Sequence, residues 1–134
     1  MRIIIIGCGR TGARLATDLS VEGHDVAIID KNADAFRRLG AEFKGNVVIG
    51  MGFDEDILRK AGSEGADFLV AVTNGDNSNI MAAEVAKSEL HVKRVIARIY
   101  DPQRAEAFQD MGIETFCSTV IMTDMVKDKI LRKG

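Results

Sequence analysis

Short β-branched runs alternate with segments of helical spacing along the whole chain. Ile3–Ile6 is a continuous apolar run, typical of a strand buried on both faces. After Gly7 the spacing changes to that of one helix face, with small or apolar residues at Gly12, Leu15, Ala16 and Leu19. Strands and helices that alternate in this way form parallel sheets joined by right-handed crossovers.

The same pattern recurs five more times. Further strands are predicted at Asp25–Ile29, Asn46–Ile49, Phe68–Val72, Val95–Ile99 and Ile113–Cys117. The intervening helices begin after Asn32, Asp54, Asp76 and Asp101, and a last helix runs from Ser118 or Thr119 to about Arg132. We therefore predict an α/β fold: a Rossmann-like, doubly wound parallel sheet of about six strands with helices on both faces. At 134 residues, the chain forms a single domain over 1–134.

The composition argues against several classes of partner. There are 18 basic and 20 acidic residues, six Phe, one Tyr and no Trp, so neither a basic surface nor a base-stacking platform for nucleic acid is expected. Cys8 and Cys117 are isolated, which predicts no zinc site and a reducing, cytoplasmic compartment. No apolar stretch approaches the ~20 residues needed to span a bilayer.

In a doubly wound sheet, ligands bind beyond the carboxyl ends of the strands. The residues expected there are Gly7–Gly12, Asp30, Gly50–Asp54, Thr73–Asn77 and Arg98–Asp101.

Gly7-Cys8-Gly9-Arg10-Thr11-Gly12 is a G-x-G-x-x-G motif placed directly after a buried strand and at the start of a helix. Gly7 permits the turn, Gly9 lets the backbone approach a pyrophosphate, and Gly12 brings the helix close to the sheet. The free amides of the first helical turn and the helix dipole favour a phosphate. The alternative is a glycine turn that only packs helix against strand.

Asp30 ends the second predicted strand, 18 residues after Gly12. A carboxylate at this place can accept hydrogen bonds from both ribose hydroxyls and repels a 2′-phosphate, which favours NAD or an adenosine nucleotide over NADP. Lys31 could offset that charge. Alternatively, Asp30 only begins the turn into a helix capped by Asn32.

Three other residues near the strand ends have two interpretations each. Arg10 lies in the phosphate loop and is either a second clamp on phosphate or a solvated side chain. Arg98 is a cation in a buried strand, so its partner is either a ligand phosphate or a carboxylate such as Asp76 or Asp101. Cys8 is either a thiol activated by the helix N-terminus or a small filler beside the glycines.

The last predicted helix carries a wide apolar stripe, formed by Ile121, Met122, Met125, Val126, Ile130 and Leu131. We expect part of this stripe to cover the sheet and the remainder to form a dimer or inter-domain contact. The alternative is a helix buried entirely within its own domain.

The whole chain resembles the N-terminal nucleotide-binding domain of the RCK family (regulator of potassium conductance, also called KTN or TrkA-N). This family includes regulatory subunits of Trk and Ktr potassium uptake systems. The matching residues are Ile3–Arg10 with Gly12, Gly23–Val26, Ile28–Lys31, Ala61-Gly62, Ala66-Asp67, Val70–Thr73, Asp76, Asn79, Ile96–Arg98 and Met111–Ile113.

The resemblance implies a ligand-sensing gate and not an enzyme. Its ligand is NAD(H) or AMP, ADP or ATP, with no metal. Its partners are further copies of the chain, as a homodimer or a ring-like oligomer, and a membrane potassium channel or transporter subunit whose pore it gates at the cytoplasmic face. The nucleotide-binding residues that it implies are Gly7, Cys8, Gly9, Arg10, Thr11, Gly12, Asp30, Lys31, Gly52, Phe53, Asp54, Thr73, Asn74, Gly75 and Arg98.

Within that set, the glycine-rich loop and Arg98 would contact phosphate, and Asp30 would hold the ribose. Lys31, Gly52–Asp54 and Thr73-Asn74 would flank adenine and ribose. The chain departs from the family pattern in two respects. Met51 follows Gly50 where the family usually has an acid, although Asp54 could supply a polar contact nearby. The smaller C-terminal domain of full-length regulators is also absent from this sequence.

The alternative from a different functional class is the cofactor domain of an NAD-dependent dehydrogenase. Such an enzyme needs a substrate pocket and an acid or base facing the nicotinamide. The six predicted βα units use the entire chain, and neither His24 nor His91 ends a strand at its carboxyl side. Tyr100 has Arg104, not lysine, four residues later. A structural or CoA-binding Rossmann subunit is a third class, but it would not require the Asp30 carboxylate.

Overall fold

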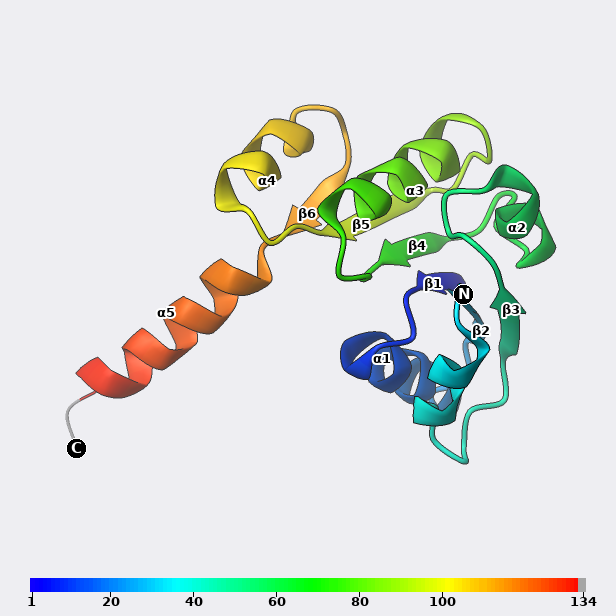
Figure 1. The fold of residues 1–134 in the computed structure, drawn as a ribbon, viewed down its shortest axis with the longest axis horizontal. Coiled ribbons are helices and arrows are strands. Elements are labelled where there is room, and N and C mark those ends of the chain that lie inside the picture. Colours follow the sequence, from blue (N-terminus) through cyan, green and yellow to red (C-terminus); the bar gives the residue numbers. More distant parts are fainter. Residues whose placement is uncertain (133–134) are drawn as a thin grey trace.

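The computed structural model describes residues 1–132 and contains one six-stranded sheet in the order β3-β2-β1-β4-β5-β6 (Figure 1). Every adjacent pair of strands is parallel. The strands are β1 (Arg2–Ile6), β2 (Asp25–Asp30), β3 (Asn46–Ile49), β4 (Phe68–Ala71), β5 (Arg94–Arg98) and β6 (Glu114–Phe116). The predicted Rossmann-like, doubly wound sheet is confirmed.

The helices follow the strands as predicted, with one difference in type. They are α1 (Arg10–Val21), η1 (Ala33–Arg38), α2 (Glu55–Lys60), α3 (Asp76–Ser88), α4 (Pro102–Gln109) and α5 (Ser118–Leu131). The segment after β2 is a 3-10 helix, capped by the Asn32 side chain, which accepts from the Asp34 N–H at 3.0 Å. The Asp101-Pro102 start of α4 is confirmed, since Asp101 accepts from the Gln103 N–H at 3.0 Å.

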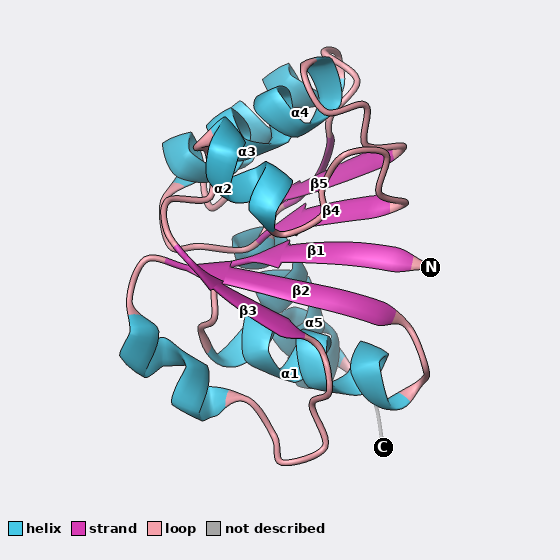
Figure 2. Ribbon diagram, turned by 90° about the vertical axis from the view of Figure 1, so that its right-hand side faces the viewer, coloured by secondary structure: helices cyan, strands magenta, loops and turns pink. Residues whose placement is uncertain are grey.

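Alternate residues of the central strands pack on opposite faces of the sheet, which explains why their sequence is continuously apolar. Ile4 and Ile6 join the core beneath α2, α3 and α4. Ile3 and Ile5 join the core beneath α1 and η1. Figure 2 shows these two layers, with α2, α3 and α4 on one side of the sheet and α1 on the other.

The chain reverses its winding at β1, which pairs with β2 on one side and β4 on the other. The helix after β1 and the helix after β4 cover opposite faces, so their connecting loops diverge at the carboxyl edge of the sheet. A crevice opens at such a switch point, and ligands of doubly wound folds bind there.

Helix α5 does not pack on the sheet. None of its residues is buried, and Figure 1 shows it running away from β6. Its stripe of Ile121, Met122, Met125, Val126, Ile130 and Leu131 exposes between 48% and 74% of each residue. The expectation that part of this stripe covers the sheet is therefore wrong, and so is the alternative of a fully buried helix.

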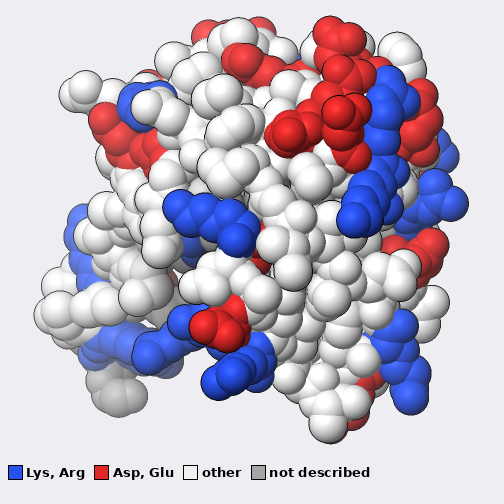
Figure 3. Space-filling model, turned by 45° about the vertical axis from the view of Figure 1, so that its right-hand side comes forward, with Lys and Arg blue, Asp and Glu red and all other residues white. Residues whose placement is uncertain are grey.

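Within residues 1–132, none of the helices combines the length and the apolar character of a membrane span. On the face seen in Figure 3, Lys and Arg side chains lie among Asp and Glu side chains and form no continuous basic stripe.

Candidate functional site

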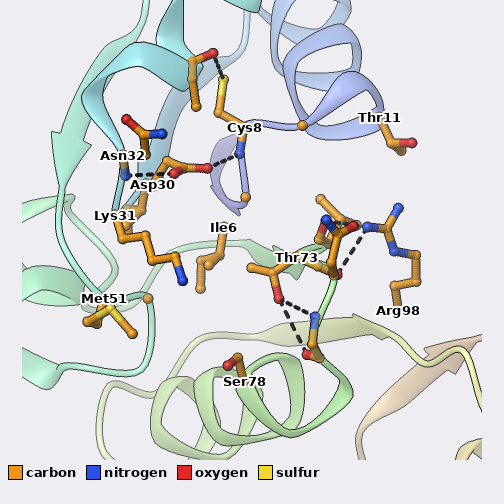
Figure 4. A pocket seen from close by; sticks show the side chains of 18 of the residues that line it. Ile6, Cys8, Thr11, Asp30, Lys31, Asn32, Met51, Thr73, Ser78 and Arg98 are labelled. Atoms are coloured by element: carbon orange, nitrogen blue, oxygen red, sulfur yellow. Dashed lines mark hydrogen bonds between the residues drawn. The ribbon is translucent and has the colours of Figure 1, made fainter.

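A cavity of about 690 Å³ opens at the switch point, beyond the carboxyl ends of β1, β2, β3 and β4. Figure 4 shows Asp30 and Lys31 on one side of it and Thr73 and Arg98 on the other. The sequence-predicted residues that line it are Gly7, Cys8, Gly9, Arg10, Thr11, Asp30, Lys31, Gly52, Phe53, Thr73, Asn74, Gly75 and Arg98. Gly12 and Asp54, also predicted, are not among the lining residues.

The glycine-rich loop presents free backbone donors to this cavity. Gly7 has φ +104°, a conformation that favours glycine, and its N–H donates to Ile29 O at 2.8 Å. α1 begins at Arg10 with no side-chain cap and no acid in its first turn. The first amides of a helix have no intrahelical partner, so this end of α1 offers N–H donors and a positive dipole to an anion.

Gly9 and Gly12 are glycines for different reasons. A Cβ on Gly12 would collide with the Gly7 carbonyl oxygen, so Gly12 serves the close packing of α1 on β1. A Cβ on Gly9 would meet nothing within 4 Å, and its φ of −81° suits any residue. The protein itself therefore gives no steric reason for glycine at position 9, and the free space beside it belongs to the cavity.

Asp30 is fixed by two backbone hydrogen bonds. Its Oδ2 accepts from the Cys8 N–H and its Oδ1 from the Asn32 N–H, both at 2.8 Å. The carboxylate thereby joins the glycine-rich loop to the turn after β2, as the structural alternative predicted. Each carboxylate oxygen has a second lone pair, so the group can still accept from ligand hydroxyls.

Arg98 is a buried cation without a carboxylate partner among residues 1–132. Its Nη2 donates to Val72 O at 2.7 Å and Thr73 O at 3.0 Å, and its Nε has no partner. The guanidinium lies 5.0 Å from the centre of the Tyr100 ring. A buried guanidinium with only carbonyl partners keeps most of its charge uncompensated, which suits an anionic ligand.

The predicted alternative, a structural pair with Asp76 or Asp101, is wrong. Asp76 accepts instead from the backbone N–H groups of Tyr100 and Asp101, at 2.8 and 3.3 Å. Asp101 caps α4. Both carboxylates therefore accept hydrogen bonds from the backbone around the loop between β5 and α4, and neither pairs with Arg98.

A buried amide positions the β4 end of the cavity. Asn79 on α3 accepts from the Thr73 N–H at 2.9 Å and donates to Thr73 O at 3.1 Å and Arg98 O at 2.8 Å. It joins the ends of β4 and β5, so Thr73 and Arg98 keep a fixed spacing. The sequence signal that could have revealed this role is an amide on a helix face that is otherwise formed by Ile80, Ala82, Ala83 and Ala86.

Cys8 fills space in the core. It is fully buried, and its Sγ donates to Ala35 O at 3.3 Å. Burial, and then the Asp30 carboxylate, raise the pKa of the Cys8 thiol against an opposing effect of Arg38. A raised pKa disfavours the thiolate, so the structure supports the filler interpretation and not an activated thiol.

Asp54 caps α2 and does not reach the cavity. Its Oδ1 accepts from the Asp56 N–H at 2.9 Å and the Ile57 N–H at 3.4 Å. The expectation that Asp54 compensates for the missing acid at position 51 is therefore not supported. Met51 itself lines the cavity.

Seven further cavity residues are not predicted by the sequence analysis. Three are apolar residues at strand ends, Ile6, Ile29 and Val72, and the other four are Asn32, Ala35, Arg38 and Ser78. Arg38 ends η1, and its Nη1 donates to Cys8 O at 3.4 Å. Ser78 lies in the first turn of α3. No motif distinguishes either residue, since each reaches the cavity only through the direction of its helix.

Comparison with known proteins agrees with this geometry. Residues 3–123 match the profile of the TrkA-N domain family. A Streptomyces coelicolor protein, named Trk system potassium uptake protein TrkA, is 49% identical over all of this chain and 60% of its own length. The chain thus spans less than two thirds of the length of that relative.

Two solved structures share the fold. The C-terminal domain of Shewanella denitrificans Kef in its AMP-bound form is 22% identical, with a TM-score of 0.83 over 98% of this chain and 80% of that one. The NAD(P)-binding domain of an exopolyphosphatase-related protein from Archaeoglobus fulgidus is 25% identical, with a TM-score of 0.78 over 96% of both chains. With its switch-point cavity, its glycine-rich loop and a profile match over nearly its whole length, this chain belongs to the TrkA-N domain family.

Proposed function

We propose that this chain is the nucleotide-sensing part of a potassium uptake system. It binds NAD(H) or an adenine nucleotide in the switch-point cavity. Binding changes the geometry between domains, and this change acts on a membrane potassium transporter or channel subunit. The observation that carries the proposal is the uncapped N-terminus of α1 beside Gly9, where the protein leaves space and free N–H donors for a phosphate.

The residues that line the cavity favour one orientation of a bound nucleotide. We place the phosphate at the loop Gly7–Thr11 and the ribose hydroxyls at Asp30; Arg98 lines the same cavity. A 2′-phosphate would bring a second negative charge to Asp30, so NADP is the weaker ligand. The AMP-bound Kef domain and the NAD(P)-binding domain from Archaeoglobus fulgidus share this fold, which supports the choice of ligand class.

The apolar stripe of α5 supports a homodimer or larger ring as the working assembly. Large apolar patches on a folded domain mark interfaces, and this helix has no buried residue of its own. The name of the Streptomyces coelicolor relative supports a partner in potassium uptake. We place the assembly at the cytoplasmic face of the membrane, attached through that partner.

The cavity is poorly equipped for catalysis. Among its lining residues, all within the described chain, there is no histidine, and Asp30 is the one carboxylate. Both oxygens of Asp30 already accept backbone N–H groups, which makes it a poor general base. We therefore favour a sensor over the alternative, the cofactor domain of an NAD-dependent dehydrogenase.

Thermal melting with a ligand panel separates these two functions. At least one of NAD, NADH, AMP, ADP and ATP should raise Tm, NADP should raise it less than NAD, and mixtures of NAD with common hydroxy acids should produce no NADH. A ligand at 100 times its Kd stabilises a protein by about 2.7 kcal/mol, which is readily measured. NADH production, or a preference for NADP, contradicts the proposal.

A further inference from the structure

We propose that the base end of this cavity does not select adenine, so that 6-oxopurine nucleotides such as IMP and GMP bind as well as AMP. The inference rests on the proposed function, because it concerns the specificity of the same nucleotide site. It follows from where the base must lie and from the hydrogen-bonding groups that meet it there.

The order of the strands places the base. The phosphate site follows β1, the ribose site at Asp30 follows β2, and the next strand in the sheet is β3. Neighbouring strands lie about 4.8 Å apart, which matches the successive steps from phosphate to ribose to base. The base therefore lies over the loop that follows β3, where Gly50, Met51, Gly52 and Phe53 line the cavity.

That loop offers no side-chain acceptor for the amino group of adenine. Two of its four residues are glycines, and Phe53 packs against the core. Met51 is 41% exposed and carries a thioether, which is only a weak acceptor. Figure 4 shows Met51 on the same side of the cavity as Lys31.

The acceptors around the loop are engaged elsewhere. Asn32 Oδ1 accepts from the Asp34 N–H at 3.0 Å, and Asp54 caps α2. Each oxygen of Asp30 accepts one backbone N–H, and its remaining lone pairs are those that the ribose hydroxyls require. An adenine amino group at this end therefore meets, among residues 1–132, no side-chain acceptor without a backbone partner.

A donor, by contrast, is free. Lys31 lines the cavity, is exposed, and forms no salt bridge with any of residues 1–132. Its ammonium group can donate to O6 and N7 of a 6-oxopurine, the pair of acceptors that Lys and Arg commonly contact in guanine. The base end therefore has no carboxylate side chain that would repel O6, and Lys31 can donate to O6 of a 6-oxopurine or to N7, which adenine also carries.

Calorimetric titration of the protein with AMP, IMP and GMP tests the inference. We expect Kd values within about threefold of one another, a difference of less than one hydrogen bond. AMP binding at least about tenfold more tightly than both others overturns the inference and leaves the proposed function standing. Absence of binding by all three overturns the inference, and the proposed function fails with it only when NAD, NADH, ADP and ATP do not bind either.

A single substitution tests the placement of the base. Met51→Asp supplies an acceptor for the adenine amino group and repels O6, so the ratio of Kd for IMP to Kd for AMP should rise by about tenfold or more. Met81→Asp is the matched control, because Met81 lies on α3, is 47% exposed and does not line the cavity. The control should keep the wild-type ratio. An unchanged ratio in Met51→Asp shows that the base lies elsewhere and overturns the inference.

Discussion

Gly9 is a glycine that the fold of the protein does not require. Its backbone conformation is ordinary, and a side chain there would meet no protein atom within 4 Å. Gly12, three residues later, is required by the fold itself, since any Cβ would collide with the carbonyl oxygen of Gly7. A substitution is therefore expected to affect ligand binding at Gly9 and folding at Gly12.

Gly9→Val should fold normally and lose nucleotide binding, because the new side chain enters the space of the phosphate. Loss of even one hydrogen bond to a charged group raises Kd by about tenfold or more. Calorimetry measures the affinity, and thermal melting checks the fold. Gly12→Val is the contrast, expected to destabilise or unfold the domain. Retained affinity in a folded Gly9→Val variant would mean that the phosphate lies elsewhere.

Asp30→Ala should weaken nucleotide binding by about tenfold or more, since the ribose hydroxyls lose their charged acceptor. It should also cost about 1 to 3 kcal/mol of stability without ligand, because the part-buried Cys8 N–H loses its partner. Chemical denaturation and calorimetry separate the two effects. Unchanged affinity would remove Asp30 from the binding site.

Among single residues of the candidate site, the sequence predicts those whose role depends on the backbone. It does not predict those that reach the cavity only because of the direction of their side chain. The spacing after β1 identified Gly7–Gly12, and the end of β2 identified Asp30. Arg38 was missed because its approach to Cys8 O depends on the 3-10 path of η1. Arg98 was recognised as an unusual cation, but only the structure shows that backbone carbonyls surround it.

Among the elements, α5 is the one whose packing is incomplete. Its exposed stripe predicts that Met125→Ser combined with Ile130→Ser lowers the oligomer mass in light scattering. The melting temperature of the domain itself should hardly change, because neither residue is buried. An unchanged mass would exclude this stripe from the interface, and a large loss of stability would show that α5 packs on its own domain.

The first and fourth strands are joined at their amino ends by a carboxylate. Asp67 accepts from the Arg2 N–H at 2.8 Å and from Lys93 Nζ at 3.0 Å, and these hydrogen bonds hold the pKa of Asp67 below its usual range. A lowered pKa stabilises the fold at pH values above the unfolded pKa of about 3.9, and this contribution disappears as the pH falls through the folded value.

Asp67→Asn should therefore lose stability at neutral pH and show a smaller further loss on acidification than the wild type. Urea denaturation at about pH 7 and about pH 3 measures both differences. An equal acid loss in the two proteins would show that the interactions of Asp67 do not contribute to acid sensitivity.

At the scale of helices and strands, the sequence predicts the positions of the strands better than the type and the packing of the helices. Buried parallel strands have a distinctive continuous apolar pattern, so all six were located within about two residues. An α-helix and a 3-10 helix of six residues share the same capping residue, so η1 could not be distinguished beforehand. An apolar stripe looks the same whether it faces a core or a partner, which is why the packing of α5 was predicted wrongly.

The whole molecule is a Rossmann sheet whose cavity-lining segments converge on one edge. The glycine-rich loop, Asp30, the β3 loop, Thr73 and Arg98 come from five different strand ends, and the order β3-β2-β1-β4-β5 brings them around one cavity. A ligand that contacts several of these segments at once links the two halves of the sheet.

Titration calorimetry of the purified chain with NADH, AMP, ADP and ATP, each up to about millimolar concentration, decides whether the cavity is a nucleotide site. We expect saturable binding of at least one of them, with one nucleotide per chain and no change in the recovered nucleotide after incubation. Absence of binding by every one of these nucleotides, or their chemical conversion by the protein, would contradict the account.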